Sequence, residues 1–325
     1  MSKVEAEIRG SWRGKERRVS HQHTVSQEVS LQGIGLHTGA RVEAILKPAP
    51  TDHGIVFRRV DLNPPVSVEA KPDNVIDTRH AVTLGKEKVG VQTVEHLLAA
   101  LAGMGIDNCL IELNGPEVPA VDGSARPWVE LIQKAQRKRQ FAPKTFLKVK
   151  ERIVVSDGPR FLQLVPSDKL MVFYTMSFGH PFLGEQSVAF NLSRRTFVEC
   201  IAPARTYVLL QDVERLRAMG LAQGGSLDNT IVIAEDGILN GGLRWRDELV
   251  RHKVLDVIGD LYLLGKPLVG TLIAYAAGHE LHIRLVQEIQ KHLEPKRANS
   301  AAPSLIERLV TPLVPGAEML EKPAT

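Results

Sequence analysis

Three polar residues, each four positions after the last, interrupt a strongly apolar stretch at residues 243–265. They are His252, Asp256 and Asp260, and side chains at i and i+4 lie on one face of an α-helix. An imidazole and a carboxylate on one face can bind a single divalent metal ion. The ordinary alternative is a polar helix face with an internal His–Asp pair, and an isolated HxxxD pattern fits that alternative better. Here the apolar neighbours favour a partly buried site, where such groups need partners.

A second helix start, in the first half of the chain, carries Glu95 and His96 on consecutive positions. Adjacent helical residues point about 100° apart, so both can border one cavity. His96 with His252 and Asp256 would give the two imidazoles and one carboxylate of a catalytic zinc site, which leaves one position for water. Water on such an ion is deprotonated near neutral pH, and Glu95 would be the general base. The ligands come from both halves, so we expect the site at a domain interface.

Hydrolysis of an amide also needs an acid and a partner for the developing oxyanion. A hydroxyl such as that of Thr206 can donate a hydrogen bond to the oxyanion, and Lys253 can meet an anionic or carbonyl group. His279 is a candidate acid, and Asp260 could hold its imidazole in the cationic form. Spacing alone leaves ordinary alternatives open: His279 as a neighbour of a helix N-terminus and Thr206 as a surface threonine.

The elements that position these residues alternate between strands and helices. Alternating patterns with Gly, Pro and Asp turns predict short strands, and amphipathic patterns predict helices, the first beginning at Gln92 or Thr93. A helix is expected to begin at Ser193. The predicted strands cover residues 24–31, 41–47, 55–59, 66–70, 108–113, 146–154, 160–165, 170–176, 186–191, 230–234 and 268–276, and helices are predicted around 128–135, 206–219, 243–265 and 278–293.

The two halves share one form: helix, glycine turn, buried strand, Gly-led loop and helix. This weak internal symmetry predicts an α+β fold of two similar two-layer α/β sandwich domains, each with a small insert, and an active site at the domain interface. We expect a flexible leader at 1–20, an N-terminal domain at 21–142, a short linker near 141–144, a C-terminal domain at 143–294 and a tail at 295–325.

Composition narrows the class of protein. The 325 residues are 43% hydrophobic and 24% charged, which is typical of a globular protein, and a net charge of +4 is too small to indicate nucleic-acid binding. Cys109 and Cys200 are far apart, which excludes a disulfide framework and a Cys-rich zinc site, and makes a reducing cytoplasm the default location. No apolar run reaches the ~20 residues that span a bilayer. A cytosolic enzyme is the expected class.

Several long motifs carry a resemblance to a known family. GIGLHTG, TVEHLLAALAGMGIDN, VPAVDGSARP, APARTY, GGSLDN and LRWRDELVRHKVLDVIGDLYLLGKPLVGTLIAYAAGH together closely resemble the UDP-3-O-acyl-N-acetylglucosamine deacetylases, the zinc amidases of lipid A biosynthesis. The match covers residues 23–293 in order. It implies one Zn²⁺ per chain on His96, His252 and Asp256, with Fe²⁺ conceivable on these ligands. It also implies Glu95 as base, His279 oriented by Asp260 as acid, and Thr206 and Lys253 on the oxyanion side.

The same resemblance assigns residues 178–205 to an insert that forms the passage for the substrate's acyl chain. Suitable wall residues are Phe182, Leu183, Val188, Phe190 and Cys200, although each could equally be core. One departure from the family pattern is His80, where an apolar residue is expected. The residues that the resemblance places near the substrate are His37, His180, Phe182, Tyr207, Leu209, Gly225 and Ser226.

The expected activity is therefore zinc-dependent removal of the N-acetyl group from UDP-3-O-(3-hydroxyacyl)-N-acetylglucosamine. The expected state is a monomer in the cytoplasm of a Gram-negative-type bacterium, with no nucleic-acid partner and no integral membrane segment. Two alternatives stay open: a catalytically silent sugar-nucleotide binding protein on the same fold, and a zinc amidase for a different N-acetylated sugar.

Overall fold

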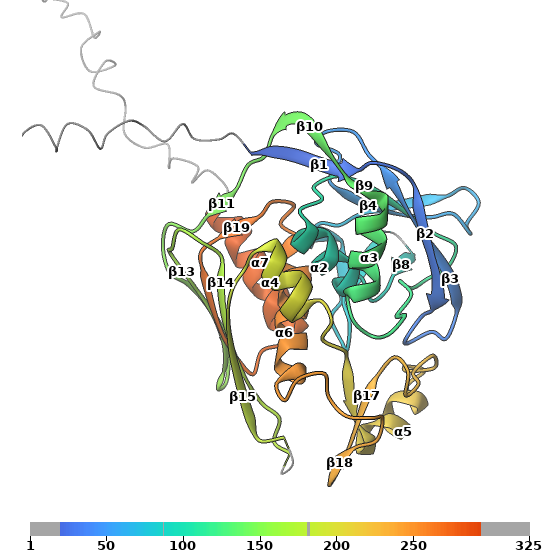
Figure 1. Cartoon of the computed structure of the whole chain (residues 1–325), viewed down its shortest axis with the longest axis vertical. Helices are drawn as coiled ribbons and strands as arrows, with labels where there is room; N and C mark the ends of the chain where they lie inside the picture. The colour runs from blue at the N-terminus through green and yellow to red at the C-terminus, as the bar shows by residue number, and fades with distance from the viewer. Residues whose placement is uncertain (1–19, 87, 181–182, 294–325) are drawn as a thin grey trace, which may run out of the picture.

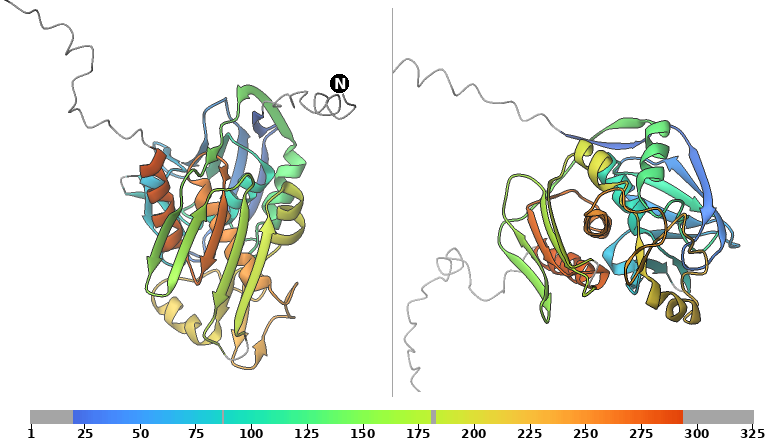
Figure 2. Two further views of the ribbon diagram at one scale, coloured as in Figure 1. Left: turned by 90° about the vertical axis from the view of Figure 1, so that its left-hand side faces the viewer. Right: turned by 60° about the horizontal axis from the view of Figure 1, so that its bottom comes forward.

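The computed structural model describes residues 20–86, 88–180 and 183–293 (Figure 1). Phe182, nearly all of the expected leader and the expected tail lie outside these residues. Two five-stranded sheets face each other across a layer of helices, which Figures 1 and 2 show from three sides. This is the α+β architecture that the alternating segments predict.

The first sheet belongs to the N-terminal half. It has the order β2-β3-β9-β4-β5, in which β4 and β9 run parallel and the other neighbours are antiparallel. Its inward-facing side chains alternate with outward-facing ones, as a sheet covered on one face requires. The strands are β2 (Val29–Ile34), β3 (Arg41–Pro48), β4 (Ile55–Arg59), β5 (Val66–Glu69) and β9 (Cys109–Leu113).

The second sheet repeats the first. Its order is β12-β13-β20-β14-β15, and again the last strand in sequence lies in the centre and runs parallel to one neighbour only, β14. The identical order in both sheets confirms the expectation of two similar domains. The strands are β12 (Ile153–Asp157), β13 (Arg160–Val165), β14 (Met171–Ser177), β15 (Glu185–Asn191) and β20 (Thr271–Tyr275).

Two helices in equivalent positions form the centre of the molecule. Helix α2 (Glu95–Met104) precedes β9, and α6 (Glu248–Tyr262) precedes β20. They pack on each other between the sheets, where α6 is seen nearly end-on in the right panel of Figure 2. Both are buried on almost every side, as expected of a helix enclosed by protein. Helices α3 (Arg126–Ala135) and α7 (His279–Leu293) follow the two central strands.

Each half also carries a small three-stranded sheet. One contains β6 (Val75–Asp77), β7 (Thr83–Lys86) and β8 (Val89–Val91); the other contains β16 (Tyr207–Leu209), β17 (Ile231–Ala234) and β18 (Gly237–Ile238), next to α5 (Leu210–Ala218). The helix predicted at 206–219 was wrong at its start. Residues 207–209 pair in parallel with 231–233, and sheet pairing takes precedence there over helical periodicity.

The expected linker at 141–144 was also wrong in part. Strand β10 (Arg137–Pro143) pairs antiparallel with β1 (His21–Val25), so the predicted strand at 24–31 is divided between β1 and β2. The expected helix start at Ser193 is confirmed, because its hydroxyl accepts a hydrogen bond from the Thr196 N–H at 3.1 Å. The remaining elements are β11 (Leu147–Lys148), β19 (Leu268–Val269), α4 (Arg194–Thr196), the short helix η1 (Pro72–Asn74) and the π-helical turn η2 (Phe197–Ile201).

The main apolar core lies around α2 and α6 and reaches both sheets. Burial of this kind is the main source of folding free energy. Among the described residues, no helix has both the length and the apolar character that crossing a membrane requires.

Candidate functional site

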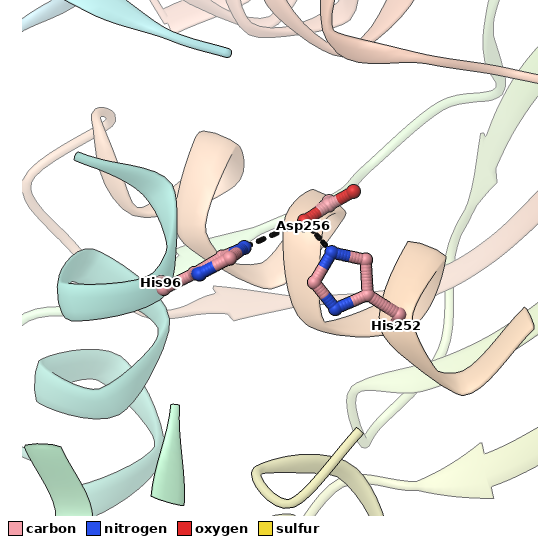
Figure 3. Close-up of side chains that lie close together, drawn as sticks. All are labelled: His96, His252 and Asp256. Atoms are coloured by element: carbon pink, nitrogen blue, oxygen red, sulfur yellow. Dashed lines mark ion pairs between the residues drawn. The ribbon is translucent and has the colours of Figure 1, made fainter. Parts of the chain in front are cut away.

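The structure brings together three side chains from the two central helices (Figure 3). His96 comes from the first turn of α2, and His252 and Asp256 lie one turn apart on α6. Asp256 Oδ1 lies 3.6 Å from His96 Nε2 and 3.4 Å from His252 Nε2. The two imidazole rings are 4.9 Å apart at an interplanar angle of 83°. Two Nε2 atoms and one carboxylate oxygen therefore face a common point.

Hydrogen bonds and burial prepare these atoms to bind a cation. The Ala204 carbonyl lies 3.0 Å from His252 Nδ1, and a carbonyl can only accept, so Nδ1 carries the hydrogen and Nε2 presents its lone pair. Burial lowers the pKa of His252 to about 3, which keeps the ring neutral. Burial would raise the pKa of Asp256, but the positive charge of Lys253, 2.7 Å away, and the polar imidazoles beside it outweigh burial and hold that pKa well below its usual range. Neutral imidazole and charged carboxylate are the forms that bind metal.

One buried oxygen supports a metal at this point. Asp256 Oδ1 is buried and has no hydrogen-bond partner within the described part of the chain. A buried carboxylate oxygen without a partner lowers the stability of the folded state unless an ion or a water molecule binds it. Because His96, His252 and Asp256 form a group whose ligand atoms all lie within 4.8 Å of one another, the residues present fit a divalent metal ion of the zinc type.

Lys253 neutralises the other oxygen of the same carboxylate. Its Nζ lies 2.7 Å from Asp256 Oδ2 and 5.4 Å from the centre of the Tyr207 ring. Burial would lower the pKa of Lys253, but Asp256 outweighs burial and raises it. The lysine is therefore a fixed positive charge next to the metal-binding group.

Glu95 enters the same space from the start of α2. The carboxyl group is buried, and burial raises its pKa. Its Oε2 accepts a hydrogen bond from the Val82 N–H at 3.1 Å, and its Oε1 lies 3.9 Å from His279 Nε2. A carboxylate with a raised pKa, held at one oxygen and free at the other, is suited to accept a proton.

His279, the first residue of α7, stands opposite Glu95. Its Nδ1 donates to Asp260 Oδ2 at 2.7 Å, which directs Nε2 towards Glu95 and Asp256. Burial alone would lower the pKa of His279, but Asp260, with help from Asp256 and Glu95, raises it to about 9. The imidazole is therefore a cation at neutral pH, and a group in this state can give up a proton.

A glycine allows the two central helices to come this close. A Cβ built on Gly259 of α6 would collide with the backbone carbonyl of Glu95. Any other residue at this position would separate α6 from α2. The distance from His96 to the His252 and Asp256 side chains depends on that contact.

A groove of about 580 Å³ reaches the site. Its wall next to the site includes Thr206 and Tyr207, and the Tyr207 ring packs edge-on against His252, with ring centres 6.2 Å apart. The volume lies within the usual range for small-molecule sites. Farther along, the wall contains Leu209, Leu210, Val213, Leu216, Leu227 and Leu239, together with the charged Asp212, Arg215 and Arg217.

The groove collects most of the residues that the sequence associates with a substrate. His37, Tyr207, Leu209, Gly225 and Ser226 all line it. His80, the departure from the family pattern, also lines it and adopts a left-handed backbone conformation with φ 66°. His180 is not among the lining residues.

The side chains expected to form the acyl passage lie elsewhere. None of those described lines the groove, although Phe178 of the same segment, 178–205, does; most of the wall comes from residues 206–239, and the rest includes Leu36, His37, His80, Met176 and Ser177. Leu183 packs with Ile231, Ile233 and Leu249, and Val188, Phe190 and Cys200 pack on the main core. The physical reason is that residues 185–191 form an edge strand of the second large sheet, whose inner face covers α6.

Glu117 is a site residue that the sequence reasoning missed. It is fully buried and its carboxylate accepts hydrogen bonds from the His37 and Thr38 N–H groups and from the hydroxyls of Thr38 and Thr93. It therefore fixes the loop that carries His37. His282 and Tyr174, which extend the Asp260 network, were missed as well. The signal for His282 was its position three residues after His279, on the same helix face.

Comparison with known proteins shows the family of the chain. Residues 22–291 match the family model described as "LpxC: UDP-3-O-acyl N-acetylglycosamine deacetylase". The chain is 51% identical over 270 residues to the UDP-3-O-acyl-N-acetylglucosamine deacetylase of Myxococcus xanthus, a match that covers 83% of this chain and 86% of the relative. Proteins of the same name from Anaeromyxobacter (49%, covering 83% and 88%) and Thioalkalivibrio sulfidiphilus (47%, covering 82% and 89%) are similarly close. The chain belongs to the LpxC family of deacetylases.

Proposed function

We propose that this protein hydrolyses the N-acetyl group of UDP-3-O-(3-hydroxyacyl)-N-acetylglucosamine and releases acetate and a free 2-amine, in a zinc-dependent reaction of lipid A biosynthesis. One observation carries the proposal: His96, His252 and Asp256 meet between a buried carboxylate and a partly buried imidazole, at the end of a largely apolar groove. Family membership supplies the substrate class.

His96, His252 and Asp256 would hold the metal ion. When bound, Zn²⁺, or Fe²⁺ on the same ligands, supplies Lewis-acid polarisation of the acetyl carbonyl and lowers the pKa of a water molecule. The oxygen that Asp256 leaves unpaired in the interior supports this assignment.

The flanking side chains would move the protons. Glu95, through its free Oε1, accepts a proton from the attacking water. His279 Nε2 donates a proton to the departing nitrogen as the amide C–N bond breaks, which leaves acetate and the amine. The Thr206 hydroxyl and the Lys253 ammonium stabilise the oxyanion that develops on the acetyl carbonyl.

The groove would bind the rest of the substrate. Its apolar wall at residues 206–239 suits the hydroxyacyl chain, and His37, His80 and Tyr207 lie where sugar atoms are expected. His180 stays a candidate for the diphosphate end. Since one chain contributes both halves of the site, we propose that the monomer is the active unit.

Metal removal is the direct test. Protein treated with a chelator should lose turnover of the UDP-sugar substrate, and one equivalent of Zn²⁺ should restore it. Activity that persists in metal-free protein would contradict the mechanism. A panel of other N-acetylated sugars, assayed beside the proposed substrate, tests the substrate class: comparable kcat/KM on a sugar without the acyl chain would contradict it.

A further inference from the structure

His282 is a buried imidazole to which the mechanism above gives no role. It lies on α7 three residues after His279, and its side chain is fully buried. Its Nδ1 lies 2.7 Å from Asp260 Oδ2, the same oxygen that His279 Nδ1 contacts at 2.7 Å. Two imidazoles therefore share one carboxylate oxygen, with ring centres 5.8 Å apart.

The hydrogens of this network can be assigned from the groups that are present. Burial would raise the pKa of Asp260, but the two histidines outweigh burial and lower it, so the carboxylate is charged and can only accept. Each Nδ1 must therefore donate a hydrogen. Burial lowers the pKa of His282, which keeps its ring neutral and its Nε2 unprotonated.

Tyr174 contacts the other nitrogen of the His282 ring. Burial raises the pKa of Tyr174 well above its usual range, so the phenol keeps its hydrogen. That hydroxyl donates to the Ala277 carbonyl at 2.9 Å and lies 3.0 Å from His282 Nε2, so it holds the far edge of the ring in place. Because the charged Asp260 carboxylate can only accept, the hydrogen that His282 directs at it is on Nδ1.

The other oxygen of Asp260 shows why a second imidazole matters. Oδ1 is buried and has no hydrogen-bond partner in the described part of the chain. The orientation of the carboxylate therefore depends on its Oδ2 contacts alone. Without His282, Asp260 would be held only by His279, the group that it is meant to orient.

We propose that His282, held by Tyr174, is a positioning residue that fixes the Asp260 carboxylate and, through it, the His279 imidazole. This inference rests on the proposed function, in which His279 is the acid. His282 does not line the groove and does not belong to the group of His96, His252 and Asp256 that is proposed to hold the metal, so its loss should affect turnover and leave substrate binding and the metal content of that group unchanged.

Substitutions at position 282 test the proposal in the metal-loaded full-length enzyme. His282→Leu removes the donor to Asp260, and kcat should fall about 10- to 100-fold with KM within twofold of wild type. His282→Asn keeps an N–H near the position of Nδ1 and should retain most of the wild-type kcat. The kcat of Tyr174→Phe should lie between those of His282→Leu and His282→Asn. His292→Leu, on an exposed histidine of the same helix, is the matched control and should change nothing.

A wild-type kcat in His282→Leu would overturn the proposal. So would equal losses in His282→Leu and His282→Asn, because a purely structural role does not depend on the retained N–H. If His282→Leu does not fold, the kcat values of wild type, His282→Asn and Tyr174→Phe test the proposal instead. A Tyr174→Phe enzyme with the wild-type kcat would overturn it.

A second readout does not depend on turnover. In selectively ¹⁵N-histidine-labelled protein, the Nδ1–H proton of His279 should give a downfield resonance protected from exchange. It should persist in His282→Asn and broaden or vanish in His282→Leu; its persistence in His282→Leu overturns the positioning role. A metal-loaded wild type that does not deacetylate the substrate would overturn the proposed function alone, because the resonance test would still decide the role of His282.

Discussion

At the scale of single residues, each titratable group of the site is held in the form that its proposed role needs. His252 is kept neutral by burial, whereas the Lys253 ammonium keeps Asp256 charged. Glu95 and His279 lie 3.9 Å apart with raised pKa values, one through burial and the other through neighbouring carboxylates. A base and an acid whose environments differ in this way can work at the same pH.

The pH dependence of turnover should show the pKa of His279. Burial lowers that pKa, but Asp260 and the nearby carboxylates raise it to about 9, so the cationic acid is present below pH 9 and is lost as the pH rises through this value. We therefore expect kcat to fall on the alkaline limb of the pH profile. Asp260→Asn removes the strongest raising partner and should move the limb to lower pH, measured by kcat profiles of both enzymes. An unchanged limb in Asp260→Asn would assign it to another group.

Substitution of Glu95 separates an enzyme from a silent sugar-nucleotide binding protein. Glu95→Ala removes the proposed base and should lower kcat about 10²- to 10⁴-fold, while calorimetry should show substrate binding retained. Glu235→Gln, an exposed carboxylate away from the metal-binding group, is the control. Near-normal turnover in Glu95→Ala would rule out Glu95 as the base.

At the scale of elements, the contact between α2 and α6 sets the geometry of the metal-binding group. Gly259→Ala places a methyl group against the Glu95 carbonyl, so the helices must separate. Overpacking of this kind costs about 1–3 kcal/mol of unfolding free energy, and metal affinity should fall because His96 moves away from His252 and Asp256.

Denaturant unfolding and metal titration measure both effects. The matched control is Gly237→Ala, because a Cβ on Gly237 in β18 meets nothing within 4 Å. Gly259→Ala with wild-type metal affinity would show that the site tolerates separation of the helices.

The elements also show how far sequence reasoning could go. The spacing of His252, Asp256 and Asp260 located α6 and put all three on one face, although α6 begins at Glu248 rather than at residue 243. The pairing of β10 with β1 was missed, because a strand that depends on a partner far away in the sequence leaves little local signal. The start of the helix predicted at 206–219 was wrong for a similar reason: residues 207–209 form a strand that pairs with 231–233, far along the chain.

The site itself was predictable only in part. Residue types suggested that His96 would meet His252 and Asp256, but no spacing argument places two helices from different halves side by side. Three features depend on tertiary contacts that the sequence does not reveal. They are the close approach at Gly259, the loop held by Glu117 and the two histidine contacts on Asp260. The family resemblance supplied the roles that geometry alone left open.

At the scale of the whole molecule, a bound metal would link the two halves, because His96 belongs to one and His252 and Asp256 to the other. A ligand that binds only the folded state stabilises it, by about 2.7 kcal/mol at a hundredfold excess over Kd. We expect Zn²⁺ to raise the Tm of the metal-free protein by several degrees in calorimetry.

Alanine variants of the proposed ligands test whether these residues bind the ion. His96→Ala and Asp256→Ala should each abolish the Zn²⁺-dependent rise in Tm, and His53→Ala, in a turn outside the metal-binding group, should keep it. A rise that survives in His96→Ala would place the ion elsewhere.

The position of the ligands along the chain also has a consequence for biosynthesis. His96 leaves the ribosome early, but it meets His252 and Asp256 only after α6 has been synthesised and has packed against α2. A nascent chain of half length would therefore contain only one of the three proposed donors. If these residues bind the metal as proposed, metal loading would follow the synthesis of α6, and a truncated translation product would lack the complete site.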